Sequence, residues 1–267
     1  MQTGPYIAER FMPKQVAAYC QRSSIDFQAF SDDWVLRLTR DGKTRWIVGY
    51  KFDVNRSGAG EVAQDKVATY AALNAAGIDA TPHYLVRSLP LELIHADNLH
   101  RTLDGVPVVA KPLEGTSGRD VTRFGTIDEA LAMIRSSGEP AWAVSPHYEL
   151  QAEYRLVMLD GGVLLSYEKS QPTLRGDLKL FNLAYGAVVI DIGNEALLAQ
   201  LSSIASRVME ATALRVAAVD IVRKLDGSLE VLEVNDGISM EHYARQSHEY
   251  ETRAGAVYDA IVAAMFN

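Results

Sequence analysis

Residues 215–241 constrain the fold most, because an Asp-Gly pair separates two largely apolar runs there. Asp226-Gly227 is typical of a two-residue hairpin loop, since both central positions of a type I′ turn need positive φ. With that loop, Asp220 faces Glu233 directly on the neighbouring strand. Asn235 lies on the same face, because successive side chains of a strand alternate. The run therefore predicts a β-hairpin that gathers two carboxylates and one amide.

The gathered side chains suggest a metal site. Directly opposed Cβ atoms lie about 4.5–5.5 Å apart, so the two carboxylates would repel each other without a cation between them. Carboxylate and amide oxygens are hard ligands, which suits Mg²⁺ shared between protein and a phosphate. The candidate metal ligands are Asp220, Glu233 and Asn235. A surface hairpin with a solvated acidic face is the alternative.

The charge balance excludes some partners. The 267-residue chain has a formal net charge of -8 at pH 7, which argues against an electrostatic nucleic-acid binder. Cys20 is the only cysteine, so the sequence holds no disulfide framework. The N-terminus lacks a signal-peptide pattern, and no apolar run approaches the ~18 residues of a transmembrane helix. We expect a cytoplasmic protein with no nucleic-acid or membrane partner, and a homo-oligomer stays open.

A second motif, residues 106–121, combines a strand, a lysine and a glycine-containing loop. The apolar strand delivers Lys111, and Pro112 closes it. Free backbone N–H groups of a small-residue loop can wrap phosphate, and a lysine at the strand end adds positive charge. The lysine precedes the glycines, so this is not a Walker motif. A plain glycine-rich turn is the alternative.

The remaining patterns predict a mixture of helices and strands. Apolar spacing and a Thr126–Glu129 capping box predict helices at residues 13–22, 61–76, 126–137, 194–212 and 250–266. Residues 55–60 are expected to be a loop. Alternating or apolar runs predict strands around Asp41-Gly42, at 84–87 and 142–145, and in a hairpin over 153–169. A three-residue Asp160-Gly161-Gly162 loop would set Lys169 opposite Glu153 as an ion pair.

Six short motifs follow one another in an order typical of a family. They are the DKVATYAALNAAGIDATPH run with Lys66, VVAKPLEGTSGRDV with Lys111, EYRLVML from Glu153, FNLAYGA with Asn182, AAVDIV with Asp220, and LEVN ending at Asn235. Through these motifs, about residues 60–245 resemble the ATP-grasp enzymes. The likeness is greatest to the amide-forming ligases related to glutathione synthetase and to the ribosomal-protein glutamate ligases.

The resemblance implies an α+β, ATP-grasp fold, in which two α+β subdomains grip ATP. Residues 1–60 would be a short N-terminal region that contains a hairpin. Residues 61–145 would form the first part of the ATP-grasp unit, with the central subdomain and a glycine-rich lid. Residues 146–267 would form the C-terminal subdomain with the metal site.

The resemblance also assigns candidate site residues. Lys66 and Lys111 would bind the ATP phosphates, under a lid made of Gly115, Thr116, Ser117 and Gly118. The hinge that binds adenine would consist of Ser145, Pro146, His147 and Tyr148, with the ribose beside Glu153. The ligands of Mg²⁺ or Mn²⁺ would be Asp220, Glu233 and Asn235. The residues near the transferring phosphate would be Arg155, Lys169 and Asn182.

The implied activity is an ATP- and Mg²⁺-dependent carboxylate–amine ligation. A substrate carboxylate would be phosphorylated to an acyl phosphate, an amine would capture it, and ADP and phosphate would leave. The substrates would be a small carboxylate and an amine, such as amino acids or a peptide. Two alternatives stay open: a small-molecule kinase that needs the same lysines and metal, and a non-catalytic nucleotide-binding module.

Substrate-binding residues are predicted from charge and position. Candidate ligands of a substrate carboxylate are Arg155, Lys169, Arg175 and Lys179. A solvated loop is the alternative for the last two. Candidates for contact with the amine, because they follow the metal ligands, are Ser239, Glu241 and His242. The histidines in general, His83 included, are interpreted as structural.

Overall fold

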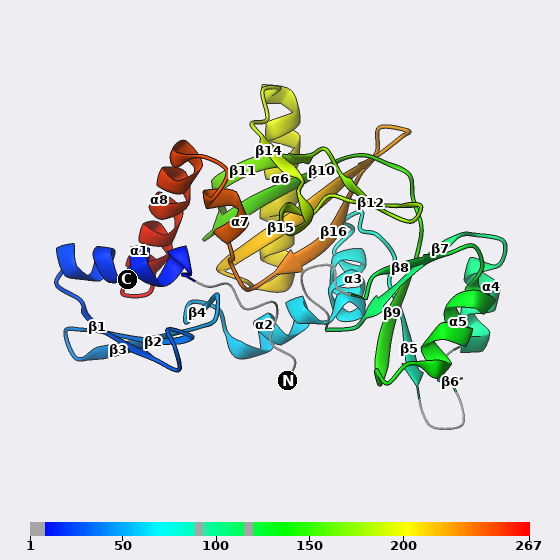
Figure 1. Ribbon diagram of the computed structural model, residues 1–267, viewed down its shortest axis with the longest axis horizontal. Helices are drawn as coiled ribbons and strands as arrows, with labels where there is room; N and C mark the ends of the chain where they lie inside the picture. The colour runs from blue at the N-terminus through cyan, green and yellow to red at the C-terminus, as the bar shows by residue number, and fades with distance from the viewer. Residues whose placement is uncertain (1–8, 89–92, 95, 115–119) are drawn as a thin grey trace.

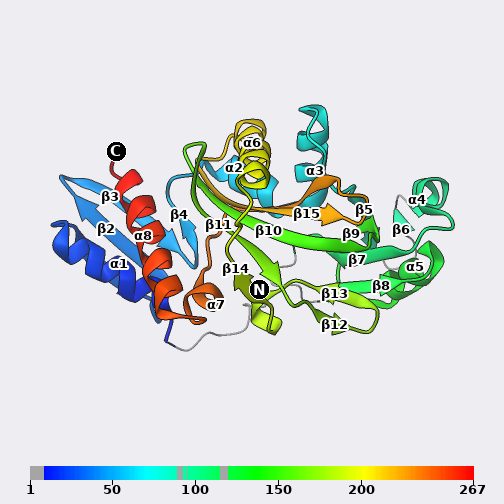
Figure 2. The same cartoon turned by 90° about the horizontal axis from the view of Figure 1, so that it is seen from above.

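The structure, a computed structural model, describes residues 9–88, 93–94, 96–114 and 120–267. Within these ranges the chain combines helices with antiparallel sheets, so the predicted α+β class is confirmed. Figures 1 and 2 show the three larger sheets in a row along the long axis, with the N-terminal sheet at one end. The domain boundaries at residues 60 and 145 stay predictions. Over the described residues, we find no helix with the length and apolar character needed to cross a bilayer.

The N-terminal sheet packs against helices from both ends of the chain. Its strand order is β1 (Asp26–Phe30), β2 (Val35–Arg40), β3 (Lys43–Val48), β4 (Lys51–Phe52). Asp41 and Gly42 close the β2–β3 hairpin with φ of 51° and 73°, which confirms that hairpin. Leu36 and Ile47 point into a core shared with α1 (Phe11–Arg22) and α8 (His248–Ala264). The two ends of the sequence thus form one core.

The second sheet carries Lys111. Its strand order is β6 (Leu93–Ile94), β5 (Tyr84–Ser88), β9 (Ala141–Pro146), β7 (Val108–Pro112), β8 (Thr122–Phe124). Helices α4 (Ala96–Leu103) and α5 (Ile127–Ser136) share a buried core with it through Leu99, Leu131 and Trp142. The Thr126 hydroxyl accepts a hydrogen bond from the Glu129 N–H at 3.3 Å, so the predicted cap of α5 is confirmed.

The third sheet carries most of the candidate site residues. Its strand order is β14 (Val188–Ile190), β11 (Gly162–Ser170), β10 (Leu150–Leu159), β15 (Val216–Lys224), β16 (Leu229–Asn235). One face packs on α6 (Glu195–Thr212), the long amphipathic helix that the sequence predicts. Tyr154 points toward α6, so Glu153 and Arg155 point to the opposite face. Smaller elements are β12 (Thr173–Arg175), β13 (Leu178–Leu180), a 3₁₀ turn η1 (Leu183–Tyr185) and α7 (Glu241–Ala244).

Two hairpins of this sheet have the predicted pairing, but their predicted loops are wrong. Asp220 lies opposite Glu233, yet the β15–β16 loop holds three residues, 225–227, and a bulge at Leu232 restores the pairing. In the β10–β11 hairpin the loop is Asp160-Gly161 alone. A bulge beyond Val157 again restores the pairing, here of Glu153 with Lys169. A loop residue and a bulge residue shift the register equally, so spacing alone does not distinguish them.

The helix predicted over residues 61–76 is in fact two helices. The first, α2 (Ser57–Gln64), begins inside the expected loop, and α3 (Lys66–Ala75) follows one extended residue, Asp65. The Asp65 carboxylate accepts hydrogen bonds of 2.9 Å from the N–H groups of Val67 and Ala68. This cap pairs amides at the helix start that otherwise lack partners. It also places Lys66 at the first position of α3.

Candidate active site

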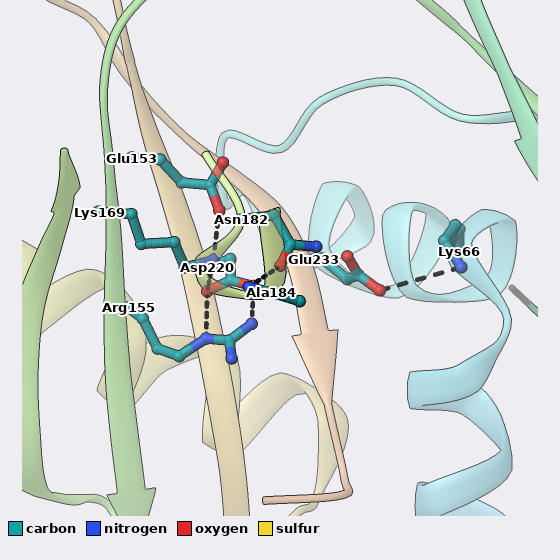
Figure 3. Close-up of polar contacts among 8 residues, drawn as sticks. All are labelled: Lys66, Glu153, Arg155, Lys169, Asn182, Ala184, Asp220 and Glu233. Atoms are coloured by element: carbon teal, nitrogen blue, oxygen red, sulfur yellow. Dashed lines mark hydrogen bonds and ion pairs between the residues drawn. The ribbon is translucent and has the colours of Figure 1, made fainter. Parts of the chain in front are cut away.

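Four charged side chains form a cluster on the third sheet, on the face away from α6 (Figure 3). Arg155 lies opposite Asp220 in register, and its guanidinium donates to the two carboxylate oxygens at 2.7 and 2.6 Å. Lys169 donates to the same carboxylate at 3.1 Å and also to Glu153. Cross-strand neighbours share a face of the sheet, which explains why three strands bring these groups together.

The cluster is almost dry. Glu153, Lys169 and Asp220 expose 7%, 5% and 2% of their surface. Burial alone would raise the pKa of Asp220, but Arg155 and Lys169 outweigh it and hold that pKa at about 2. Burial raises the pKa of Glu153, against the effect of Lys169. Asp220 is therefore ionised at neutral pH, with its charge balanced in a region where an unpaired charge is costly.

The two predicted phosphate lysines come from different elements and lie near the same acids. Lys66 donates to the Leu113 carbonyl at 3.2 Å, and its Nζ lies 3.9 Å from Oε1 of Glu233. Burial lowers the pKa of Lys111 to about 8, while Glu233 and Asp220 act to raise it and Lys66 lowers it. Because groups of the third sheet act on a lysine of the second, ionisable side chains of both sheets converge here.

The three predicted metal ligands lie on the β15–β16 hairpin. Asp220 is paired with Glu233, and Asn235 follows two residues along β16. Asp220 accepts three hydrogen bonds, which leaves about one of the four lone-pair positions of a carboxylate. The Glu233 side chain is 28% exposed. Nδ2 of Asn235 is buried without a hydrogen-bond partner, and turning the amide by 180° puts an oxygen at that position.

This donor set fits Mg²⁺ or Mn²⁺. Two carboxylates and an amide oxygen are hard ligands, and Mg²⁺ commonly takes its remaining positions from phosphate and water. Over the part of the chain that the structure describes, no three Asp, Glu, His or Cys side chains are grouped to hold a metal ion. The candidate site therefore depends on the Asn235 amide and on oxygens supplied by a ligand.

The predicted adenine hinge, residues 145–148, connects β9 with β10 and so joins the second sheet to the third. Ser145 is buried, and the His147 N–H donates to the Pro107 carbonyl at 2.7 Å. Nζ of Lys224 lies 4.7 Å from the ring centroid of Tyr148. Contact of this segment with adenine stays a prediction. The predicted lid, residues 115–118, lies outside the described residues.

Three further predicted residues lie between the third sheet's strands β11 and β14 in sequence. The Asn182 side chain accepts a hydrogen bond from the Ala184 N–H at 2.8 Å and caps η1 (Figure 3). Arg175 is exposed and lies 4.9 Å from the ring centroid of Tyr185. Lys179 is exposed and pairs with Glu149 at 3.2 Å. Their contacts with a substrate stay predictions.

Glu241 has a different position from the one expected. It is fully buried, and it accepts hydrogen bonds from the N–H groups of Phe11 at 2.7 Å and Met12 at 3.1 Å. Glu241 therefore caps α1, whose own N-cap residue makes no side-chain cap. The prediction that Glu241 contacts the amine is wrong, because its carboxylate has no exposed surface. Ser239 and His242 stay candidates.

One residue near the lysines was not predicted as part of the site. His83 is buried, and both Lys111 and Lys66 act on its pKa. In the sequence it stands outside any charged cluster, between Pro82 and Tyr84. No spacing signal relates it to Lys111, because the fold alone brings the two together.

Solved structures share the fold at low sequence identity. D-alanyl-alanine synthetase A from Vibrio cholerae matches with a TM-score of 0.64 and 14% identity, over 99% of this chain and 97% of that one. D-alanine–D-alanine ligase from Bacillus anthracis matches with a TM-score of 0.61 and 19% identity, over 81% and 69%. The ATP-grasp ligase PsnB, complexed with a minimal precursor, Mg and ADP, matches with a TM-score of 0.53 and 17% identity, over 80% and 62%. No curated protein matches the sequence significantly.

A family model covers the region that holds most of the site. This model, of an ATP-grasp domain that is the third family of its clade, matches residues 107–261, which is more than half of the chain. The match includes Lys111, the charged cluster and the metal hairpin. Together with the structural matches it confirms the predicted ATP-grasp fold. The chain belongs to this family of ATP-grasp domains.

Proposed function

We propose that this protein is an ATP- and Mg²⁺-dependent carboxylate–amine ligase, which forms an amide bond through an acyl phosphate. The observation that carries the proposal is the convergence of Lys66 and Lys111 with Glu233 and Asp220. Cations for a phosphate chain and oxygen ligands for a divalent metal come together there. Phosphoryl transfer depends mainly on such positioning and charge stabilisation. Family membership and a fold shared with ligases support the same reaction class.

In this proposal the nucleotide lies between the second and third sheets. Lys66 and Lys111 bind its phosphates, residues 115–118 cover them, and residues 145–148 bind adenine through backbone groups. Glu153 lies beside the ribose. The burial of both lysines supports this role, because a charge in a low-dielectric site binds phosphate more strongly than one in water.

The metal hairpin and the charged cluster serve the transferring phosphate. Asp220, Glu233 and Asn235 hold Mg²⁺, which when bound neutralises charge on the phosphoryl group. Arg155 and Lys169 keep Asp220 ionised and oriented, as their hydrogen bonds to its carboxylate indicate. Arg155, Lys169 and Asn182 also lie near the phosphoryl group and the acyl phosphate in this proposal.

The chemistry takes two steps. An oxygen of the substrate carboxylate attacks the γ-phosphorus, the bond from that phosphorus to the bridging oxygen breaks, and ADP leaves. The amine nitrogen then attacks the acyl carbon, loses a proton, and phosphate leaves. Acyl phosphates hydrolyse, so the protein has to exclude water during the interval. The buried cluster supports such exclusion.

The substrates that we propose are amino acids or a peptide. Similar structures are named as a D-alanine–D-alanine ligase and as a ligase complexed with a precursor, which supports this class. Those names belong to proteins under 25% identical, so the carboxylate and the amine have to be found by experiment.

The test is a product analysis by ³¹P NMR. The protein is incubated with Mg-ATP and a pool of amino acids and small carboxylates, and each phosphorus-containing product is identified. The proposal expects ADP and free phosphate, formed only when both a carboxylate and an amine are present. Phosphate retained on a metabolite would instead show a kinase. ADP formation without either substrate would contradict the ligase.

A further inference from the structure

His83 lies on a segment that is attached to the metal strand. The Thr81 N–H donates to the Val231 carbonyl, and the Val231 N–H donates to the Asp79 carbonyl, both at 2.9 Å. The His83 side chain is only 3% exposed, and its Nε2 atom is buried without a hydrogen-bond partner. Buried polar atoms in proteins nearly always have a partner. The unpaired nitrogen therefore indicates that a ligand completes this position.

The surroundings of His83 favour an anion. Burial, Lys111 and Lys66 hold the pKa of His83 well below its usual value, while a hydrogen bond to the Thr81 backbone acts the other way. His83 also lines a small depression together with Lys66, Tyr70 and Glu233. Two cations from α3 and β7 thus act on the ring, with one carboxylate from β16 in the same depression. A ligand that brings negative charge would relieve the repulsion among three bases.

We propose that His83 binds the nucleotide phosphates through Nε2, as a third nitrogen ligand beside Lys66 and Lys111. The inference rests on the proposed function and adds a residue to its nucleotide site. Phosphate oxygens are acceptors, so Nε2 has to carry a proton to donate to them. That proton comes from solvent as the phosphate charge offsets the charge of the lysines. Nucleotide binding is therefore linked to proton uptake, and adenosine, which has no phosphate, gains nothing from His83.

The experiment measures binding rather than turnover. Isothermal titration calorimetry gives the affinity of the parent protein, His83→Phe and His83→Gln for ADP and for adenosine, without added metal. His83→Phe should weaken ADP binding about tenfold or more, the value of a hydrogen bond to a charged group, and leave adenosine binding unchanged. His83→Gln places a neutral N–H donor near the same position and should restore most of the ADP affinity.

Proton uptake is the second readout. Titrations at neutral pH in two buffers of different ionisation enthalpy give the number of protons taken up with ADP. The parent should take up a fraction of a proton that is absent in His83→Gln. His248→Gln is the matched control, because the His248 side chain is 93% exposed, and it should behave as the parent does.

Each outcome decides between the two proposals. If the parent does not bind ADP, the proposed function fails. If the parent binds ADP but His83→Phe binds it equally well, the role of His83 alone is overturned. If His83→Phe weakens ADP and adenosine alike, or proton uptake persists in His83→Gln, His83 has a structural role only. Thermal melting of the variants without ligand shows whether each is folded.

Discussion

Arg155 and Asp220 form a two-point ion pair between adjacent strands, with donor–acceptor distances of 2.7 and 2.6 Å. The side chains are 23% and 3% exposed, so the contact is mostly shielded from water. Lys169 adds a further hydrogen bond of 3.1 Å to the same carboxylate. The orientation of Asp220, one of the candidate metal ligands, is therefore set by the protein itself.

Replacing Arg155 should cost much of the stability of the fold. Arg155→Met leaves two buried carboxylates with the single cation of Lys169, so we expect a loss of about 3–5 kcal/mol in the free energy of unfolding. Urea denaturation measures it. Arg215→Met is the control, since Arg215 pairs with Asp160 at 2.7 Å between half-exposed side chains and should cost about 1 kcal/mol or less. Equal losses in the two variants would contradict the role assigned to burial.

Lys111 should weaken the ligand-free fold while serving the nucleotide. Its pKa is about 8 in the folded protein and 10.5 in the reference state, so the unfolded chain binds more protons between these values. The stability of the parent should therefore rise as the pH increases from 8 toward 10.5. Lys111→Met should remove this rise and stabilise the protein by roughly 3 kcal/mol at neutral pH.

Two measurements check the Lys111 prediction. Urea denaturation at neutral and alkaline pH gives the stability difference, and melting with and without ADP gives the ligand effect. The variant should melt higher than the parent alone, yet gain less from ADP. A less stable variant at neutral pH, or one with the full ADP effect, would count against the environment or the role assigned to Lys111.

Glu233 should matter for metal-dependent turnover more than for folding. Its side chain is 28% exposed and lies 3.9 Å from Lys66. Glu233→Gln should reduce Mg²⁺-dependent turnover on the order of a hundredfold or more, because a charged ligand near the transferring phosphate is lost. Its urea midpoint should change little. Glu230→Gln on the same strand, which breaks a pair with Lys224 at 2.5 Å, should keep the Mg²⁺ dependence. Similar kinetics for both variants would remove Glu233 from the metal site.

Gly60 should resist substitution because of the residue that follows Asn235. A Cβ at Gly60 would lie 2.7 Å from Oδ2 of Asp236, a carboxylate that also pairs with Lys51 at 3.1 Å. A Cβ at Gly58 meets nothing within 4 Å, so Gly58→Ala should stabilise α2 by about 0.5–1 kcal/mol. Gly60→Ala should lack this gain and be less stable than Gly58→Ala by about 1 kcal/mol or more. Equal urea midpoints would show that Asp236 moves aside without cost.

The sequence predicts the cross-strand pairs better than the loops. The pairs Asp220 with Glu233 and Glu153 with Lys169 are both correct, although both predicted loops are wrong. Side-chain alternation preserves which residues share a face, and in each hairpin a bulge offsets the different loop. The order of the motifs also leads to the correct fold family.

Contacts between distant segments could not be predicted in this way. Asp65 interrupts a helix because its carboxylate caps the next one, yet the apolar spacing continues across it. Glu241 is predicted from its position to contact an amine, but its partner is α1, which is 230 positions earlier in the sequence at Phe11. His83 meets Lys111 only through the packing of two sheets. Such contacts depend on the complete topology, which local patterns do not encode.

The cap that Glu241 gives to α1 has a consequence for the order of biosynthesis. The amide of Phe11 leaves the ribosome long before its partner, which is 230 positions later in the chain. Leu36 and Ile47 likewise precede Tyr258 and Ile261, which complete their core. Isolated hairpins are marginally stable in water. The first strands should therefore stay incompletely packed on the nascent chain, where chaperones can bind them, until α8 has been translated.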